Sequence, residues 1–204
     1  KEYISEKKIK NKIKFINFDF NKNKKLNKFK LLPKLDYIVF SAGLAKYNLI
    51  KDFNEKSFNE VMNVNLNQTA KLFGFLVRSK KINDKASVVI VSSISGYKLA
   101  FNMHYAYSIS KGGLIAMIKS LALELSAKLI RVNGVAPGMV ETPLSKKLQQ
   151  DEYYKNIDKS KYPLGKRYAK VREISNVIDF LPSQKASFIT GQTVVVDGGF
   201  TLTK

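Results

Sequence analysis

The chain has 204 residues, of which 45% are hydrophobic, enough for one domain with a sizeable core. It contains no cysteine, which excludes a disulfide framework and thiolate chemistry and favours a reducing cytoplasm. No apolar run is long enough to span a bilayer, and the N-terminal KEYISEKKIKNKIK is too charged for an apolar signal core. We therefore expect a cytoplasmic protein in which residues 1–204 form a single domain without membrane contact.

The charge of the chain is strongly positive, with 36 lysine and arginine residues, 16 acidic residues and a formal net charge of +20. Such a charge suits nucleic acid, an anionic surface or an acidic partner. Only four of the basic residues are arginine, the side chain that base-reading and bidentate phosphate contacts favour. Asparagine and isoleucine are also abundant, as in A+T-rich coding sequences. We interpret the charge first as coding bias, then as a fit to an acidic protein or cofactor, and last as nucleic-acid binding.

The predicted elements alternate along the chain. Short runs rich in β-branched and aromatic residues predict buried strands at 13–20, 35–43, 87–93, 130–138 and 193–199. Apolar residues at helical spacing predict helices at 54–80, 105–127 and 171–182, with a short helix possible between the first two strands. Alternating strands and helices indicate a doubly wound parallel α/β sheet, which binds ligands at the carboxyl ends of its strands.

The helix predicted at 105–127 carries Tyr107 and Lys111 four positions apart, so both side chains lie on one face. A free tyrosine has a pKa of about 10 and is a poor proton carrier at neutral pH. A nearby lysine cation favours the phenolate, lowers this pKa and makes tyrosine a usable general acid or base. The pair alone also fits a surface tyrosine beside a solvated lysine. Tyr105 has Ile109 at the matching offset and gains no such support.

Two polar residues upstream strengthen the first interpretation. Ser93 ends the strand predicted at 87–93, where its hydroxyl can bond a substrate oxygen beside Tyr107; otherwise it is an ordinary strand-ending serine. Asn65 lies between apolar neighbours in the helix predicted at 54–80. A buried asparagine needs hydrogen-bond partners. Asn65 can bond backbone groups and a water, or it can be a purely structural buried amide.

Six segments in register resemble signatures of the short-chain dehydrogenase/reductase family, from about residue 13 to 201. They are FSAG at 40–43, NVNL at 63–66, VSSISG at 91–96, YSISK at 107–111, NGVAPGMVET at 133–142 and FITGQTVVVDGG at 188–199. PLGKR and ASFITGQTVVVDGG make the resemblance nearest to the 3-oxoacyl-[acyl-carrier-protein] reductase type. It implies a Rossmann-like doubly wound sheet and hydride transfer between NAD or NADP and a carbonyl or alcohol, with ketone reduction expected.

The resemblance assigns four catalytic residues. Tyr107 is the general acid or base, and Lys111 lowers its pKa and bonds the nicotinamide ribose. Ser93, rather than Ser92, orients the substrate carbonyl, because the second serine of such a pair matches the family position. Asn65 holds a water that connects Lys111 to a proton relay.

The resemblance also implies a cofactor site and no metal site. Asp19 matches an acidic position that contacts the adenine amino group. Ala42 and Gly43 let the backbone approach the cofactor, and Val140 and Thr142 hold its carboxamide. The full expected set is Asp19, Ala42, Gly43, Tyr107, Lys111, Pro137, Gly138, Val140 and Thr142. His104, the only histidine, is expected to be a loop residue.

The phosphate-binding turn T-G-x-x-x-G-x-G of the family is absent, since all 11 glycines lie at or after Gly43. We expect a truncated form of a longer enzyme, without the family's first strand and helix; a natural remnant that lost cofactor binding is the alternative. The choice between NAD and NADP stays open. PLGKRYAKVREI has one residue more than the family spacing, so Arg167 receives no role. Residues 143–162 fall where the family has a mobile substrate lid, with Tyr153 and Tyr154 as candidate substrate contacts.

The expected substrate is a small molecule or an acyl group on acyl carrier protein, whose acidity suits the charge of the chain. We expect a homotetramer or homodimer formed through the Tyr107 helix and the last strand. The alternatives are a sugar or small-alcohol dehydrogenase of the same family, a non-catalytic relative that acts as a binding module, and a basic nucleic-acid-binding protein, the interpretation we rank last.

Overall fold

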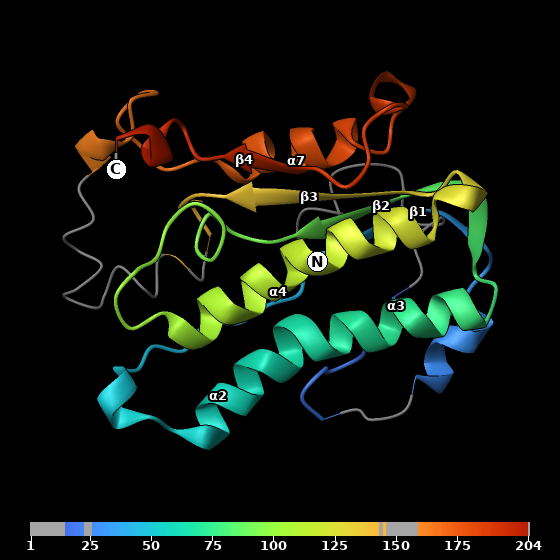
Figure 1. The fold of residues 1–204 in the computed structure, drawn as a ribbon, viewed down its shortest axis with the longest axis horizontal. Helices are drawn as coiled ribbons and strands as arrows, with labels where there is room; N and C mark the ends of the chain where they lie inside the picture. The colour runs from blue at the N-terminus through green and yellow to red at the C-terminus, as the bar shows by residue number, and fades with distance from the viewer. Residues whose placement is uncertain (1–14, 23–25, 143–144, 146–158, 204) are drawn as a thin grey trace.

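The computed structural model describes residues 15–22, 26–142, 145 and 159–203. Within these residues four parallel strands form one sheet in the order β1-β2-β3-β4 (Figure 1). The strands are β1 (Leu35–Phe40), β2 (Ile82–Val91), β3 (Arg131–Pro137) and β4 (Thr193–Val196). No helix in the described part of the chain has the length and apolar character needed to cross a membrane.

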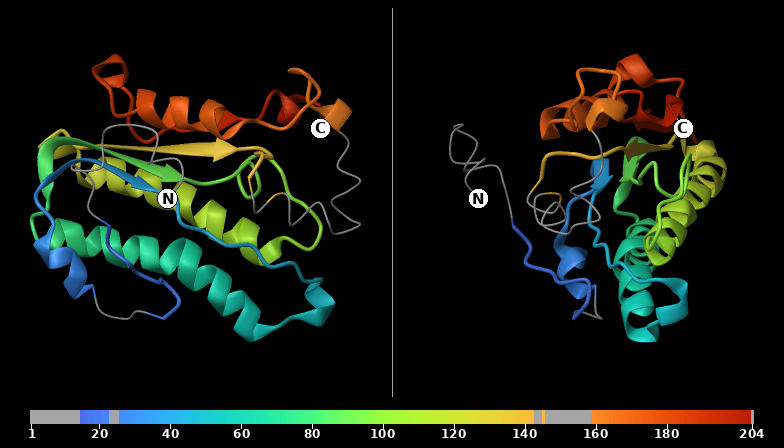
Figure 2. Two further views of the ribbon diagram at one scale, coloured as in Figure 1. Left: turned by 180° about the vertical axis from the view of Figure 1, so that it is seen from behind. Right: turned by 90° about the vertical axis from the view of Figure 1, so that its left-hand side faces the viewer.

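Helices cover both faces of the sheet (Figure 2). The longer ones are α2 (Glu55–Met62), α3 (Gln68–Arg78), α4 (Tyr105–Glu124) and α7 (Val171–Phe180), with a π-helical turn, η4 (Asn63–Asn67), joining α2 to α3. Short 3-10 helices are η2 (Asn27–Leu31), η3 (Ile50–Asp52), η5 (Ser126–Lys128), η6 (Lys159–Lys161), η7 (Gln184–Ala186) and η8 (Phe200–Leu202). The right-hand view of Figure 2 shows α2, α3 and α4 on one side of the strands and α7 on the other.

The buried side chains of strand β2 explain why helices pack against both faces of the sheet. Its residues from Ala86 to Ile90 are all buried, as expected for a central parallel strand. Alternate side chains point to opposite faces. Val88 and Ile90 join the cluster under α3 and α4, whereas Val89 joins the cluster that contains Ile174 of α7.

The last two crossover connections between strands have opposite handedness. The chain passes from β2 to β3 through α4 on one face and from β3 to β4 through α7 on the other. Both steps move to the next strand in the same direction across the sheet. The second crossover therefore has the opposite hand to the first, an uncommon arrangement for parallel strands.

The predicted α/β fold class, with a parallel sheet between helices, is confirmed. The last four predicted strands and the three predicted helices are all present, with shifted ends. Strand β2 begins at Ile82 instead of residue 87, because a bulge with Lys85 at a φ of 64° extends its pairing with β1. The helix predicted at 54–80 is interrupted by the π-helical turn.

The strand predicted at 13–20 is wrong for its described residues, 15–20, which form no strand. A strand needs a hydrogen-bonded neighbour, and β1 pairs with β2 alone among the described strands. The segment instead packs by its aromatic side chains. The ring of Phe18 lies 5.3 Å from that of Phe20 and 5.0 Å from that of Phe29, in edge-on contacts.

Candidate active site

A cavity of about 300 Å³ opens at the carboxyl ends of β1, β2 and β3, where parallel α/β sheets bind their ligands. Residues from the loop after β1, the end of β2, the start of α4 and the end of β3 line it. They are Ser41, Gly43, Leu44, Ala45, Tyr47, Val91, Ser92, Ser93, Ile94, Ser95, Phe101, His104, Tyr107, Lys111, Pro137, Gly138, Met139, Val140, Thr142 and Ser145. Most residues of the predicted site therefore share one cavity.

Tyr107 and Lys111 both face this cavity from α4, as their spacing predicted. Lys111 is buried, its Nζ donates to the Val91 carbonyl at 2.9 Å, and it lies 5.6 Å from the centre of the Tyr107 ring. Helical periodicity brings the two residues to one face, and β2 supplies the carbonyl that holds the cation in place.

The expected lowering of the Tyr107 pKa is not found in this structure. Burial of the phenol raises its pKa above the ordinary value, and a hydrogen bond with Ser93 acts in the opposite direction. Burial also lowers the pKa of Lys111 to about 8. Both shifts have one cause, because the apolar surroundings disfavour the charged form of each group.

The two serines at the end of β2 have different partners. Ser92 Oγ donates to the carbonyl of Lys111 at 2.9 Å, which attaches the strand to α4. Ser93 Oγ accepts from the Ser95 backbone N–H at 3.1 Å and also bonds the Tyr107 side chain. The structure thus places Ser93, and not Ser92, beside the phenol.

Asn65 is completely buried in the π-helical turn and holds the loop after β1. Its Oδ1 accepts from the Leu44 N–H at 2.8 Å, and its Nδ2 donates to the Leu44 carbonyl at 2.9 Å and to Ser110 Oγ at 3.0 Å. Both amide protons are therefore used by protein groups. A water held by this side chain can therefore donate a hydrogen bond only to the second lone pair of Oδ1.

Gly43 leaves space beside these groups. A Cβ atom there would lie 3.3 Å from Lys111 Nζ and 3.4 Å from Asn65 Oδ1. A side chain would therefore crowd the lysine, whereas glycine lets a flat ligand approach it. This space fits the chemistry of a nicotinamide cofactor, because the Lys111 cation and the backbone carbonyl at the end of β2 lie beside a glycine that has no side chain.

The segment after β3 supplies the opposite side of the cavity. The Gly138 N–H donates to the Val196 carbonyl at 3.0 Å, and a Cβ at Gly138 would lie 3.0 Å from that of Asp197. Thr142 Oγ1 accepts from the Ser145 N–H at 3.1 Å. The Thr142 hydroxyl keeps its proton available for a ligand.

Two predicted cofactor residues lie outside the cavity lining. Ala42 is absent from it, although Ser41 and Gly43 on either side contribute. Asp19 is exposed in the segment before η2, where its Oδ1 accepts from the Asn21 N–H at 2.8 Å. The assignments of both residues stay predictions.

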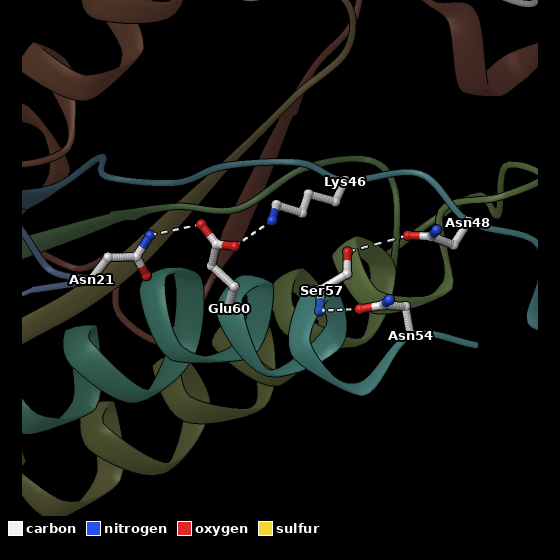
Figure 3. Close-up of polar contacts among 6 residues, drawn as sticks. All are labelled: Asn21, Lys46, Asn48, Asn54, Ser57 and Glu60. Carbon is white, nitrogen blue, oxygen red and sulfur yellow. Dashed lines mark hydrogen bonds and ion pairs between the residues drawn. The ribbon is translucent and has the colours of Figure 1, made fainter. Parts of the chain in front are cut away.

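A polar network fixes the loop that carries Gly43 (Figure 3). Glu60 of α2 pairs with Lys46 of the loop and accepts from Asn21 Nδ2 at 2.8 Å. One turn earlier on α2, Ser57 Oγ donates to Asn48 Oδ1 at 3.2 Å. The Lys46 cation lowers the pKa of the Glu60 carboxyl. The part of the loop that follows Gly43 is thus attached to α2 at Lys46 and Asn48.

The cavity wall also contains residues that the sequence did not suggest, above all His104. His104 lies in the loop immediately before α4, as expected, and it lines the same cavity three positions before Tyr107. Helical spacing from Tyr107 was the available signal.

The predicted lid lies mostly outside the described residues, as do Tyr153 and Tyr154. Arg167, which received no role, forms a two-pronged ion pair with Glu173, with nitrogen–oxygen distances of 2.6 and 2.7 Å.

The chain is similar over most of its length to several known proteins. A family model described as enoyl-(acyl carrier protein) reductase matches residues 24–201. The 3-oxoacyl-[acyl-carrier-protein] reductase FabG of Buchnera aphidicola subsp. Schizaphis graminum is 38% identical over 169 residues, which cover 83% of this chain and 68% of the relative. The FabG of Thermotoga maritima is 37% identical over 174 residues, 83% of this chain and 67% of the relative.

Solved structures show the same fold. A short chain dehydrogenase family protein from Francisella tularensis superposes with a TM-score of 0.83 at 31% identity, covering 93% of this chain and 81% of that protein. The aldohexose dehydrogenase of Thermoplasma acidophilum superposes with a TM-score of 0.76 at 28% identity, covering 86% and 71%. Likeness at this level over most of the chain shows that it belongs to the short-chain dehydrogenase/reductase family and is an oxidoreductase that resembles the 3-oxoacyl-[acyl-carrier-protein] reductases.

Proposed function

We propose that the protein reduces a ketone to an alcohol with NADH or NADPH, and that Tyr107 is the general acid. The observation that carries this proposal is the hydrogen-bonded pair of Tyr107 and Ser93 in a cavity at the strand ends, with Lys111 beside the phenol. Two hydroxyl groups that converge on one point suit a carbonyl oxygen.

The protein groups divide the work of proton transfer. With its pKa raised by burial, Tyr107 keeps its proton at neutral pH and can deliver it to the carbonyl oxygen. Ser93 donates a second hydrogen bond to that oxygen. Lys111, with a pKa of about 8, keeps most of its charge at pH 7 and stabilises the phenolate that remains.

A nicotinamide cofactor supplies the hydride when it is bound. Lys111 would bond its ribose, Gly43 would let it lie against the backbone, and Val140 and Thr142 would hold its carboxamide. From the family resemblance alone, Asp19 is proposed to contact the adenine amino group, and Ala42 to let the backbone approach the cofactor.

The proposed substrate is a 3-oxoacyl thioester carried by acyl carrier protein, or a smaller ketone of the same kind. The names of the relatives support the carrier-bound form, and the net charge of +20 suits an acidic carrier. We also propose a homodimer or homotetramer. Apolar residues of α4 face outward, with Ile109 51% and Leu123 79% exposed, and a second copy would cover them.

The test is Tyr107→Phe in the intact protein. The rate of 3-oxoacyl thioester reduction, monitored as the loss of NAD(P)H absorbance, should fall at least about a hundredfold because the proton donor is removed. Tyr105→Phe is the matched control on the same helix, and it should keep its rate. Circular dichroism should show the same fold in both. Near-normal turnover by Tyr107→Phe would refute the proposed role.

A further inference from the structure

His104 lies in the cavity wall immediately before α4, next to a turn that hydrogen bonds hold in place. The preceding residue, Met103, has a φ of 64°, a left-handed conformation that is strained for a side chain of this kind. Two hydrogen bonds hold this turn: Asn48 N–H donates to the Met103 carbonyl at 3.1 Å, and Met103 N–H donates to Asn102 Oδ1 at 3.0 Å. The loop after β1 and the loop before α4 therefore fix one another.

The imidazole of His104 is the centre of an aromatic wall. Its ring centre lies 4.7 Å from that of Tyr47, 5.5 Å from that of Phe101 and 5.9 Å from that of Tyr107, the last in edge-on geometry. The side chain is buried, with 8% of its surface exposed, and all four residues line the cavity. Phe101 stacks in turn on Phe200 of η8, which supports the wall from behind.

The wall faces the place where a substrate substituent must lie. A carbonyl oxygen that accepts hydrogen bonds from Ser93 and Tyr107 lies within about 3 Å of both hydroxyls. His104, Tyr47 and Phe101 line the same cavity as Ser93 and Tyr107, so a group attached to that carbonyl shares the cavity with these rings.

The cavity offers few free polar side chains to a charged or polyhydroxylated group, because the lining serines Ser92, Ser95 and Ser145 already bond protein groups. Among the described residues that line it there is no aspartate, glutamate, asparagine or glutamine, the side chains that bind several sugar hydroxyls at once. Its one cationic side chain among the described residues is Lys111, whose donors are held by the Val91 carbonyl and, in the proposed function, by the cofactor ribose. His104 adds no positive charge at neutral pH, since burial lowers its pKa to about 4.

From this geometry we infer that His104 is a specificity-determining residue: with Tyr47 and Phe101 it selects ketones whose neighbouring group is uncharged and flat or aliphatic, and it rejects anionic and sugar substrates. The inference rests on the proposed ketone reduction and adds the class of substituent that the site accepts.

The test compares two substrates with the same ketone, ethyl acetoacetate and acetoacetate, which differ in the charge of the neighbouring group; glucose is the sugar comparison. The intact protein should favour the ester by more than about tenfold in kcat/KM. His104→Ala should lose about tenfold of this preference, mainly through a higher KM for the ester. His104→Phe should restore it, because the aromatic surface returns. Tyr97→Ala, in the same loop but outside the cavity lining, is the matched control and should leave the preference unchanged.

An unchanged ester-to-acid ratio in a folded His104→Ala protein, or a parent that prefers acetoacetate or glucose, would overturn the inference. A second readout needs no turnover. His104 is the only histidine in the sequence, so its imidazole proton resonance is identified by its absence from the spectrum of His104→Phe. Ethyl acetoacetate should shift this resonance and acetoacetate should not; equal effects, or none, would count against the inference. If the parent reduces no carbonyl compound, the proposed function fails, and the resonance alone decides the role of His104.

Discussion

Burial sets the protonation of three titratable side chains around the cavity. It raises the pKa of Tyr107, lowers that of Lys111 to about 8 and lowers that of His104 to about 4. In each case the uncharged form is favoured because water is excluded. At neutral pH the phenol and the imidazole are therefore uncharged, and Lys111 keeps most of its charge. In the proposed mechanism, a negative charge arises beside this cation when Tyr107 transfers its proton.

The lowered pKa of His104 makes folding sensitive to acid. The neutral imidazole contributes its full stability above the unfolded pKa of about 6.5 and loses it as the pH falls through the folded value of about 4. The titratable side chains whose rings contact it are Tyr47, in tilted geometry, and Tyr107, in edge-on geometry. A free phenol ionises near pH 10, far above this range. His104→Phe should therefore lose about 1 to 3 kcal/mol less stability than the parent between pH 6.5 and 4.

Urea unfolding of both proteins at several pH values measures this difference. All other titratable groups are the same in the two proteins, so their contributions to the pH dependence of stability cancel in the comparison. Parallel pH profiles for the parent and the variant would contradict the prediction.

At the scale of elements, Asn65 connects three parts of the fold through one side chain. It lies in the π-helical turn, binds both backbone groups of Leu44 in the loop after β1, and donates to Ser110 of α4. The turn thus sets the distance between Gly43 and Lys111, which is the space that the cofactor is proposed to use.

Replacement of this amide should cost stability as well as activity. Asn65→Leu leaves the Leu44 N–H and carbonyl without their partner in a buried place, and we expect a loss of about 2–4 kcal/mol in the free energy of unfolding. Asn67→Leu, at an exposed position of the same turn, is the control and should change stability by less than about 0.5 kcal/mol. Denaturant unfolding measures both; equal stabilities would show that Asn65 holds the loop weakly.

At the scale of the whole molecule, β3 ties the sheet to the C-terminal segment through its polar side chains. Arg131 donates to the carbonyls of Leu181 at 2.6 Å and Pro182 at 3.0 Å, and Asn133 Nδ2 donates to that of Ile189 at 2.7 Å. These carbonyls lie between α7 and β4, in the crossover of unusual hand. The side chains thus position the segment that leads to the last strand.

Removal of the guanidinium should loosen this attachment. Arg131→Met keeps the aliphatic part but leaves several carbonyls without a charged donor, so we expect the free energy of unfolding to fall by about 2–4 kcal/mol. Arg172→Met, on the exposed face of α7, should have little effect. Hydrogen exchange of the β4 amides locates the loss; equal protection in the parent and Arg131→Met would contradict this role.

Much of the fold and about half of the site could be predicted from the sequence. Apolar periodicity located four strands and three helices because it reflects which side chains are buried. Helical spacing placed Tyr107 and Lys111 on one face, and strand-end position placed Ser93 in the cavity. The strand predicted at 15–20 fails because its pattern is local, whereas a strand also needs a neighbour.

The sequence by itself determined the elements and the residue types that can transfer a proton, since both depend on neighbours within a few positions. Tertiary structure alone decided the environment of those groups. Burial raised the Tyr107 pKa against the expected effect of Lys111. Asn65 found its partner Leu44 21 positions away. His104 became the centre of an aromatic wall because the ring of Tyr47, far along the chain, packs against it. Solvation and long-range contact depend on the whole fold, so no local pattern can specify them.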